Sequence, residues 1–136
     1  MILNKSHERL YADQAFATPR LVKHYEVEYA IPFESGVNAL REIISILNSD
    51  KHSQAFPVEV RFTPENNTIP LSPNYHQKCF WIAVHAYWKD PFQTLFQECE
   101  QVMKQYGGRA HWGKMHTLTH EEIKNLYPAL SEFHSV

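Results

Sequence analysis

The spacing of apolar residues predicts three β-strands. The first covers residues 22–31, where apolar and polar side chains alternate. Its apolar row is Tyr25, Val27, Tyr29 and Ile31, and its polar row is His24, Glu26 and Glu28. Residues 58–62 alternate in the same way and predict a short second strand. A nearly continuous apolar run over residues 80–88 predicts a third, and residues 109–114 are a candidate fourth.

Apolar residues at intervals of three and four predict helices between these strands. The first helix covers residues 35–47, with Ser35 as its N-cap. Its apolar stripe is Val37, Leu40, Ile43, Ile44 and Leu47. The second helix is expected to begin with Asp90 as N-cap and Pro91 as its first residue, and to end at the glycine pair 107–108.

A third helix is predicted after Thr119, because Thr119 and Glu122 have the spacing of a capping box. The resulting order is strand, helix, strand, strand, helix, short strand and helix, which is that of the ferredoxin-like split βαβ arrangement. Two helices would cover one face of an antiparallel sheet and leave the other face open, an α+β fold. At 136 residues the chain is expected to form a single domain, residues 1–136.

The strand pattern also indicates which side chains line the open face. In the third strand, the row suited to the helix-covered core is Phe80, Ile82, Val84, Ala86 and Trp88. The opposite row is Trp81, Ala83, His85 and Tyr87. Glu59 and Arg61 share one face of the second strand, so pairing of the two strands would bring these groups together. One interpretation is a solvated face with an ordinary ion pair between Glu59 and Arg61. The aromatic side chains favour another, a binding surface or an interface with a second domain.

Cationic and aromatic residues are densest in the segment GGRAHWGKMHTLTHEE. The cationic or titratable residues around Trp112 are Arg109, His111, Lys114 and His116. One interpretation is an anion-stabilising site that combines Lys114 with Arg61 and His111, and the other is a solvated loop at a helix end. A metal site of His111, His116 and His120 is not predicted, because neither a cysteine nor a second carboxylate lies at ligand spacing.

Composition excludes several classes of protein. With 43% apolar and 21% charged residues, the chain is neither disordered nor of low complexity. Its formal net charge of −2 and the lack of a basic stripe argue against a nucleic-acid partner. The longest apolar stretch is far shorter than the roughly 20 residues of a membrane span, and the first residues lack the apolar core of a signal peptide. We therefore expect a cytoplasmic location, with Cys79 and Cys99 as buried thiols.

Several segments are specific enough to indicate a family. They are HYEVEYAIPFESGVNALREI, FPVEVRF, LSPNY, WIAVHAYW and YGGRAHWGKMHTLT, followed by LYPAL. Together they resemble the aldonolactone oxidoreductases, which include D-arabinono-1,4-lactone oxidase, L-gulonolactone oxidase and alditol oxidase. These are flavoproteins of the vanillyl-alcohol-oxidase class. The resemblance extends from Tyr25 to Phe133, and its most specific part is HWGK combined with the upstream Glu-x-Arg. The chain departs from the family at Ala110, where proline is common, and at His76 and Gln77, where Gly-Arg is frequent.

The resemblance implies the substrate (cap) domain of an FAD-dependent oxidoreductase that oxidises a sugar-1,4-lactone or an alditol. Hydride would pass to the flavin, and electrons then to oxygen or another acceptor. The family's FAD-binding domain has no counterpart in this chain, so a separate FAD-binding domain or subunit would be its partner. The chain alone is expected to hold no FAD and to be inactive, and membrane association is known for some members. The alternative is a non-enzymatic ferredoxin-like interaction module that binds a partner, or self-associates, through its aromatic open face.

The same resemblance implies roles for individual residues. Arg61 and Lys114 would polarise the substrate oxygen and stabilise negative charge on the reduced flavin. Glu59 would accept a hydrogen bond from a substrate hydroxyl and hold Arg61 in place. His85 would accept or relay the hydroxyl proton. The residues expected to line the substrate pocket or to shape its loop are Tyr87, His111 and Trp112. No metal ligands are implied.

Overall fold

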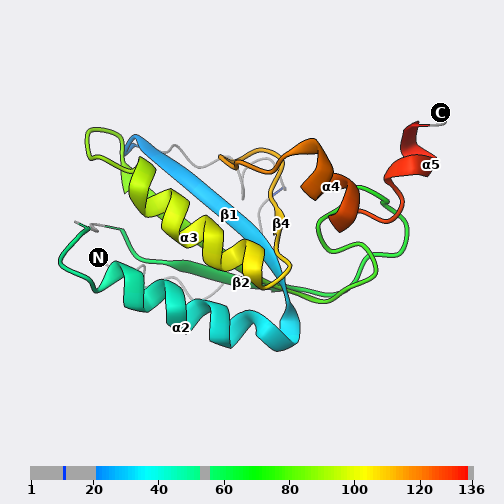
Figure 1. Ribbon diagram of the computed structural model, residues 1–136, viewed down its shortest axis with the longest axis horizontal. Helices are drawn as coiled ribbons and strands as arrows, with labels where there is room; N and C mark the ends of the chain where they lie inside the picture. Colours follow the sequence, from blue (N-terminus) through cyan, green and yellow to red (C-terminus); the bar gives the residue numbers. More distant parts are fainter. Residues whose placement is uncertain (1–10, 12–20, 53–55, 135–136) are drawn as a thin grey trace.

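The computed structural model of the chain describes residues 11, 21–52 and 56–134. Within these residues, four strands form one sheet, and two long helices lie across one of its faces (Figure 1). The elements in chain order are β1 His24–Pro32, the 3₁₀ turn η1 Phe33–Ser35, α2 Gly36–Leu47, β2 Glu59–Thr63, β3 Cys79–Tyr87, α3 Gln93–Gln105, β4 Arg109–Ala110, α4 His120–Leu126 and α5 Leu130–His134.

The sheet has the strand order β2-β3-β1-β4, and every neighbouring pair is antiparallel. Strand β3 lies between β1 and β2, which are joined through α2, so the connection is a split βαβ unit. The predicted α+β fold with an antiparallel sheet is therefore confirmed. Fully buried apolar side chains from the helix-facing rows of β1 and β3 pack against fully buried side chains of α2 and α3. The large ones on the strands are Tyr29, Ile31, Ile82, Val27 and Val84, and those on the helices are Ile43 and Met103.

Helix α2 approaches the sheet closely at its first residue. A Cβ atom on Gly36 would come within 2.1 Å of Cγ of Phe80, so only glycine fits here beside β3. Ser35 occupies the predicted N-cap position, but its side chain makes no capping hydrogen bond. The predicted apolar stripe is wider than the face the helix buries, since Val37 and Ile44 are 49% and 42% exposed.

Two predictions around the end of β3 are wrong. Helix α3 begins at Gln93 rather than at Pro91, and its N-cap residue is Phe92. Asp90 instead closes the turn after β3, where its backbone N–H donates to the carbonyl of Tyr87. Trp88 lies beyond the last residue of the strand and is 43% exposed, so it does not belong to the core. Strand β3 ends before this side chain can turn toward the helices.

Strand β4 is shorter than predicted, because it pairs with β1 only at Arg109 and Ala110. Gly108, just before it, permits this pairing: a Cβ atom there would lie 2.6 Å from the carbonyl oxygen of Met103 and 2.7 Å from Cδ1 of Ile31. After β4 the chain turns, and it contacts β1 again where the backbone N–H of Met115 donates to the carbonyl of Glu26. This turn carries Lys114.

Both cysteines are buried free thiols, as predicted. Burial raises the pKa of Cys99 to about 12 and also raises the pKa of Cys79, so neither side chain is a reactive thiolate at neutral pH. No helix in the described residues has the length and apolar character needed to cross a membrane.

The capping box predicted for α4 is present. The hydroxyl of Thr119 accepts from the backbone N–H of Glu122, and the carboxylate of Glu122 accepts from the backbone N–H of Thr119. Lys104 of α3 forms an ion pair with the same carboxylate at 3.0 Å. The hydrogen bond from the Thr119 backbone, followed by the contact with Lys104, lowers the pKa of Glu122 to about 2.

This shifted pKa predicts a loss of stability in acid. A carboxylate whose pKa is lowered by folding stabilises the native state above its ordinary pKa, and that contribution is lost as the pH falls from about 4.5 to about 2. Thermal unfolding of the wild-type chain and of Glu122→Gln should therefore differ at pH 7 and converge at low pH. The difference will be modest, because the side chain of Glu122 is 39% exposed and solvent screens it. A difference that stays constant with pH would contradict this role.

Candidate functional site

The open face of the sheet carries carboxylates from β1 and β2 next to the predicted site residues of β3. Strand pairing places Glu26 of β1 opposite His85 of β3. It also places Glu28 of β1 and Glu59 of β2 on either side of Ala83. Cross-strand partners point to the same side of a sheet, so all these side chains lie on the face opposite α2 and α3.

Arg61 is held on this face by two contacts. Its Nε donates to Oε1 of Glu28 at 2.7 Å, and its guanidinium carbon lies 3.9 Å from the centre of the Trp81 ring. The indole N–H of Trp81 donates to the hydroxyl of Thr63 at 2.8 Å, which fixes the ring beneath the guanidinium. Glu28 is only 5% exposed, whereas the side chain of Arg61 is 40% exposed. The arginine is thus anchored at one end and open to solvent at the other.

The partner of Arg61 differs from the prediction. Glu59 was expected to hold Arg61 in place, but the anchoring carboxylate is Glu28 of β1. Residues 59 and 61 lie two apart on one strand, roughly 7 Å from each other, whereas Glu28 reaches the arginine from across β3. Glu59 is exposed on the same face and therefore available for other contacts.

Lys114 reaches the same face from the turn that follows β4. The backbone N–H of His111 donates to the carbonyl of Glu28, and that of Lys114 donates to the carbonyl of His111. The turn therefore lies along the edge of β1, and the Lys114 ammonium hydrogen-bonds and ion-pairs with the carboxylate of Glu26. Lys114 and Arg61 are thus bound to carboxylates two residues apart on one strand, roughly 7 Å between Cα atoms.

The electrostatics of this cluster follow from burial and from the pairing of opposite charges. Burial alone would raise the pKa of Glu26, but the hydrogen bond and charge of Lys114, with smaller contributions from His85 and His24, outweigh it and lower the pKa. Burial lowers the pKa of His85, and the nearby Glu26 carboxylate offsets this only in part. At neutral pH the site therefore combines an ionised Glu26 with a neutral His85 that can accept a proton.

Two predicted cluster residues have a structural role beside the site. Arg109 is 9% exposed, and its guanidinium donates to the carbonyls of Pro73 and Tyr75 at 3.2 and 2.8 Å. The indole N–H of Trp112 donates to the carbonyl of Leu71 at 2.8 Å. Through these hydrogen bonds, both side chains hold the long loop between β2 and β3 against the segment that carries Lys114.

The remaining predicted residues lie around the charged cluster. His111 accepts a hydrogen bond from the backbone N–H of Gly113, and its ring centre is 6.0 Å from that of Trp81. Tyr87 lies at the end of β3, in the same row as His85. A surface pocket beside the ammonium of Lys114 is lined by His24, Tyr25, Glu26, Gly113, Lys114 and Met115.

Comparison with known proteins identifies the family. The sequence profile of the D-arabinono-1,4-lactone oxidase family matches residues 4–136. The chain belongs to this family. It is 38% identical over 125 residues to an L-gulono-1,4-lactone dehydrogenase of Mycobacterium tuberculosis, an alignment that covers 92% of this chain and 29% of the relative.

Animal relatives show the same partial coverage. An L-gulonolactone oxidase of Scyliorhinus torazame is 32% identical over 137 residues, covering 97% of this chain and 31% of the relative. The L-gulonolactone oxidase of Mus musculus is 36% identical over 116 residues, covering 82% and 26%. The chain thus spans about three tenths of the length of these lactone oxidoreductases.

For this lactone oxidase family member, sequence reasoning missed the residues of β1 that complete the site. Glu26 and Glu28 were identified as the polar row of the first strand, but they were not joined to Arg61 and Lys114. The signal was present in the alternation of that strand. What was missing was the register, which sets Glu26 opposite His85 and brings Glu28 within reach of Arg61.

Proposed function

We propose that this chain supplies the substrate-binding face of an FAD-dependent oxidoreductase that oxidises a sugar-1,4-lactone or an alditol. The observation that carries the proposal is the pair of cations on the open face, each held by its own carboxylate: Arg61 by Glu28, and Lys114 by Glu26. Side chains positioned in this way before substrate binds can stabilise negative charge without reorganising. Membership of a family of lactone oxidoreductases supports the substrate class.

The donor set of this face suits the family's cofactor. FAD, when bound, accepts the hydride that leaves the substrate carbon. Arg61 binds Glu28 through Nε, which leaves its terminal N–H groups without a hydrogen bond among the described residues. These donors and the Lys114 ammonium match the oxygen and nitrogen acceptors of a flavin ring and the oxygen of a substrate alcohol. The FAD-binding domain or subunit is the partner that the proposal requires.

Each remaining residue contributes a separate step. Removing hydride from an alcohol also requires loss of the hydroxyl proton, and the neutral imidazole of His85 accepts it. Arg61 and Lys114 then stabilise the charge that develops on the substrate oxygen. The exposed carboxylate of Glu59 accepts a hydrogen bond from another substrate hydroxyl. Tyr87 lines the same face, while His111 and Trp112 support the turn that aims Lys114.

The alternative, a non-enzymatic module that docks a protein through aromatic side chains, has less support. Of the two aromatic side chains that favoured it, Trp81 and Tyr87, Trp81 is only 5% exposed because the Arg61 guanidinium lies over the ring. The open face is therefore dominated by charged groups, which suits a polyhydroxylated substrate better than an apolar partner.

The test is to combine the chain with the family's FAD-binding domain by co-expression and to add a 1,4-lactone without oxygen. Bleaching of the flavin absorption reports substrate oxidation whatever the final electron acceptor is. We expect bleaching with a lactone or an alditol in the assembled protein, and none with the Arg61→Ala, Lys114→Ala double variant on the same time scale. Assembly that yields bound FAD but no bleaching with any lactone or alditol would contradict the proposal.

A further inference from the structure

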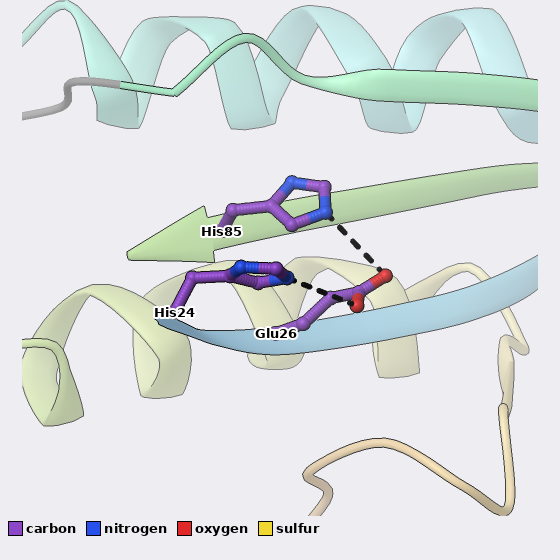
Figure 2. A group of neighbouring side chains, drawn as sticks. All are labelled: His24, Glu26 and His85. Atoms are coloured by element: carbon purple, nitrogen blue, oxygen red, sulfur yellow. Dashed lines mark ion pairs between the residues drawn. The ribbon is translucent and has the colours of Figure 1, made fainter. Parts of the chain in front are cut away.

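Two histidines and a glutamate gather at one end of the open face, with their ligand atoms directed toward one another (Figure 2). His24 and Glu26 project from β1, and His85 projects from β3 as the cross-strand partner of Glu26. One ligand atom from each residue lies within 4.8 Å of the other two. Among the described residues, these two imidazoles and one carboxylate are close enough together to hold a metal ion.

The separations in this group are close to those a metal ion needs. Nε2 of His85 is 3.5 Å from Oε1 of Glu26, and Nε2 of His24 is 3.9 Å from Oε2 of Glu26. With bonds of about 2.0–2.2 Å to nitrogen and oxygen, tetrahedral ligands of zinc lie roughly 3.3–3.6 Å apart. Shifts of roughly half an ångström or less would bring these two contacts into that range. The two histidine ligand atoms, which lie within 4.8 Å of each other, would have to approach by at most about 1.5 Å.

The ring of His24 already has the orientation of a ligand. Its Nδ1 lies 2.9 Å from the carbonyl of Val22. A carbonyl only accepts hydrogen bonds, so Nδ1 carries the proton and Nε2 presents its lone pair toward Glu26. Metal-binding histidines are commonly oriented by a hydrogen bond of this kind from the second ring nitrogen. The side chain of His85 is only 11% exposed and is held by packing with Nε2 toward the same carboxylate.

Lys114 is the group that opposes a metal ion here. Its ammonium is bound to Oε2 of Glu26, and a divalent cation within a few ångströms would repel it. The side chain of Lys114 is 29% exposed, so the ammonium can move into solvent when it loses this partner. Glu26 can therefore pair with the ammonium or with a metal ion, and each occupant weakens binding of the other.

We propose that His24, Glu26 and His85 form a binding site for a divalent transition-metal ion of the zinc type, in competition with Lys114. Two imidazoles and a carboxylate are a donor set that zinc accepts when water fills the fourth position. An occupied site separates Lys114 from its counter-ion and engages Nε2 of His85. A consequence for activity rests on the proposed function: an ion bound at this site inhibits lactone oxidation.

The test is calorimetric titration of the 136-residue chain with Zn²⁺, without FAD or substrate, so that its outcome does not depend on the proposed function. We expect one ion per chain at this site. His24→Ala and His85→Ala should each weaken binding by about 100-fold or more, because loss of even an outer-shell partner typically costs 10- to 100-fold. Lys114→Met should strengthen binding by about tenfold, since it removes a competing positive charge.

Two further variants keep the test decisive. His120→Ala removes an exposed histidine on α4 and should leave the affinity unchanged. Glu26→Gln preserves side-chain size and should weaken binding, and circular dichroism checks that each variant is folded. Zinc binding that persists in both His24→Ala and His85→Ala would overturn the site, as would the absence of binding in both the wild type and Lys114→Met. Equal affinities of wild type and Lys114→Met would overturn the competition.

Discussion

Replacing Lys114 by alanine is expected to lower kcat of the assembled oxidoreductase by roughly 10²- to 10³-fold, the usual cost of removing one charge-stabilising donor. The ammonium is held by Glu26 on the same face as Arg61, so it is positioned before negative charge develops on the substrate oxygen. Arg61→Ala should show a loss of the same order. Steady-state kinetics with a 1,4-lactone, recorded through reduction of an artificial electron acceptor, measures both effects.

A matched control is available at Lys51, whose side chain is 73% exposed beyond the end of α2 and pairs only weakly with Glu98. Lys51→Ala should leave kcat unchanged. Lys51→Ala should also unfold at nearly the same temperature as the wild type, because its exposed ion pair contributes little to stability. Lys114→Ala should unfold at a lower temperature, because the Glu26 side chain, 14% exposed, loses its partner. A kcat of Lys114→Ala equal to that of Lys51→Ala would exclude the proposed role of Lys114.

Replacing Glu100 by alanine is expected to lower the free energy of unfolding by about 2–4 kcal/mol, because the buried Tyr29 hydroxyl and two donors of Thr117 would lose their acceptor. Glu100 lies on α3 and is only 4% exposed. Its carboxylate accepts from the fully buried Tyr29 hydroxyl, and from the backbone N–H and the hydroxyl of Thr117, both at 2.6 Å. Chemical denaturation measures the change.

The matched variant is Glu100→Gln, which keeps the shape of the side chain and one acceptor oxygen. We expect it to cost about 1 kcal/mol, because the Thr117 hydroxyl can rotate to accept from the new amide. Since Thr117 follows Lys114 closely, Glu100→Ala should also loosen the turn that aims the ammonium. Equal stabilities of the two variants would show that Glu100 acts only by filling space.

Local patterns predicted the elements of this protein well. Alternation placed each long strand within two residues of its observed bounds, and the Thr119–Glu122 spacing correctly predicted the start of α4. Errors arose where two local signals compete. Asp90 and Pro91 have the chemistry of a helix start, yet Asp90 is used by the turn after β3, and the helix begins later.

For the candidate site as well, the local pattern predicted some features correctly and missed those that depend on distant residues. Periodicity correctly put Arg61, His85 and Glu59 on one face, because side-chain direction in a strand alternates residue by residue. It did not reveal the burial of Glu100 on α3, which depends on Tyr29 and Thr117 from distant parts of the chain.

The sequence by itself determined the α+β class, the two faces of each strand and membership of the lactone oxidase family, since these depend on local periodicity and on motifs. Only the tertiary structure decided which carboxylate pairs with which cation. Glu28 rather than Glu59 holds Arg61, and Glu26 holds Lys114, because antiparallel register and the turn after β4 set those distances. Register arises from contacts between residues far apart in the chain, and a local pattern does not encode it.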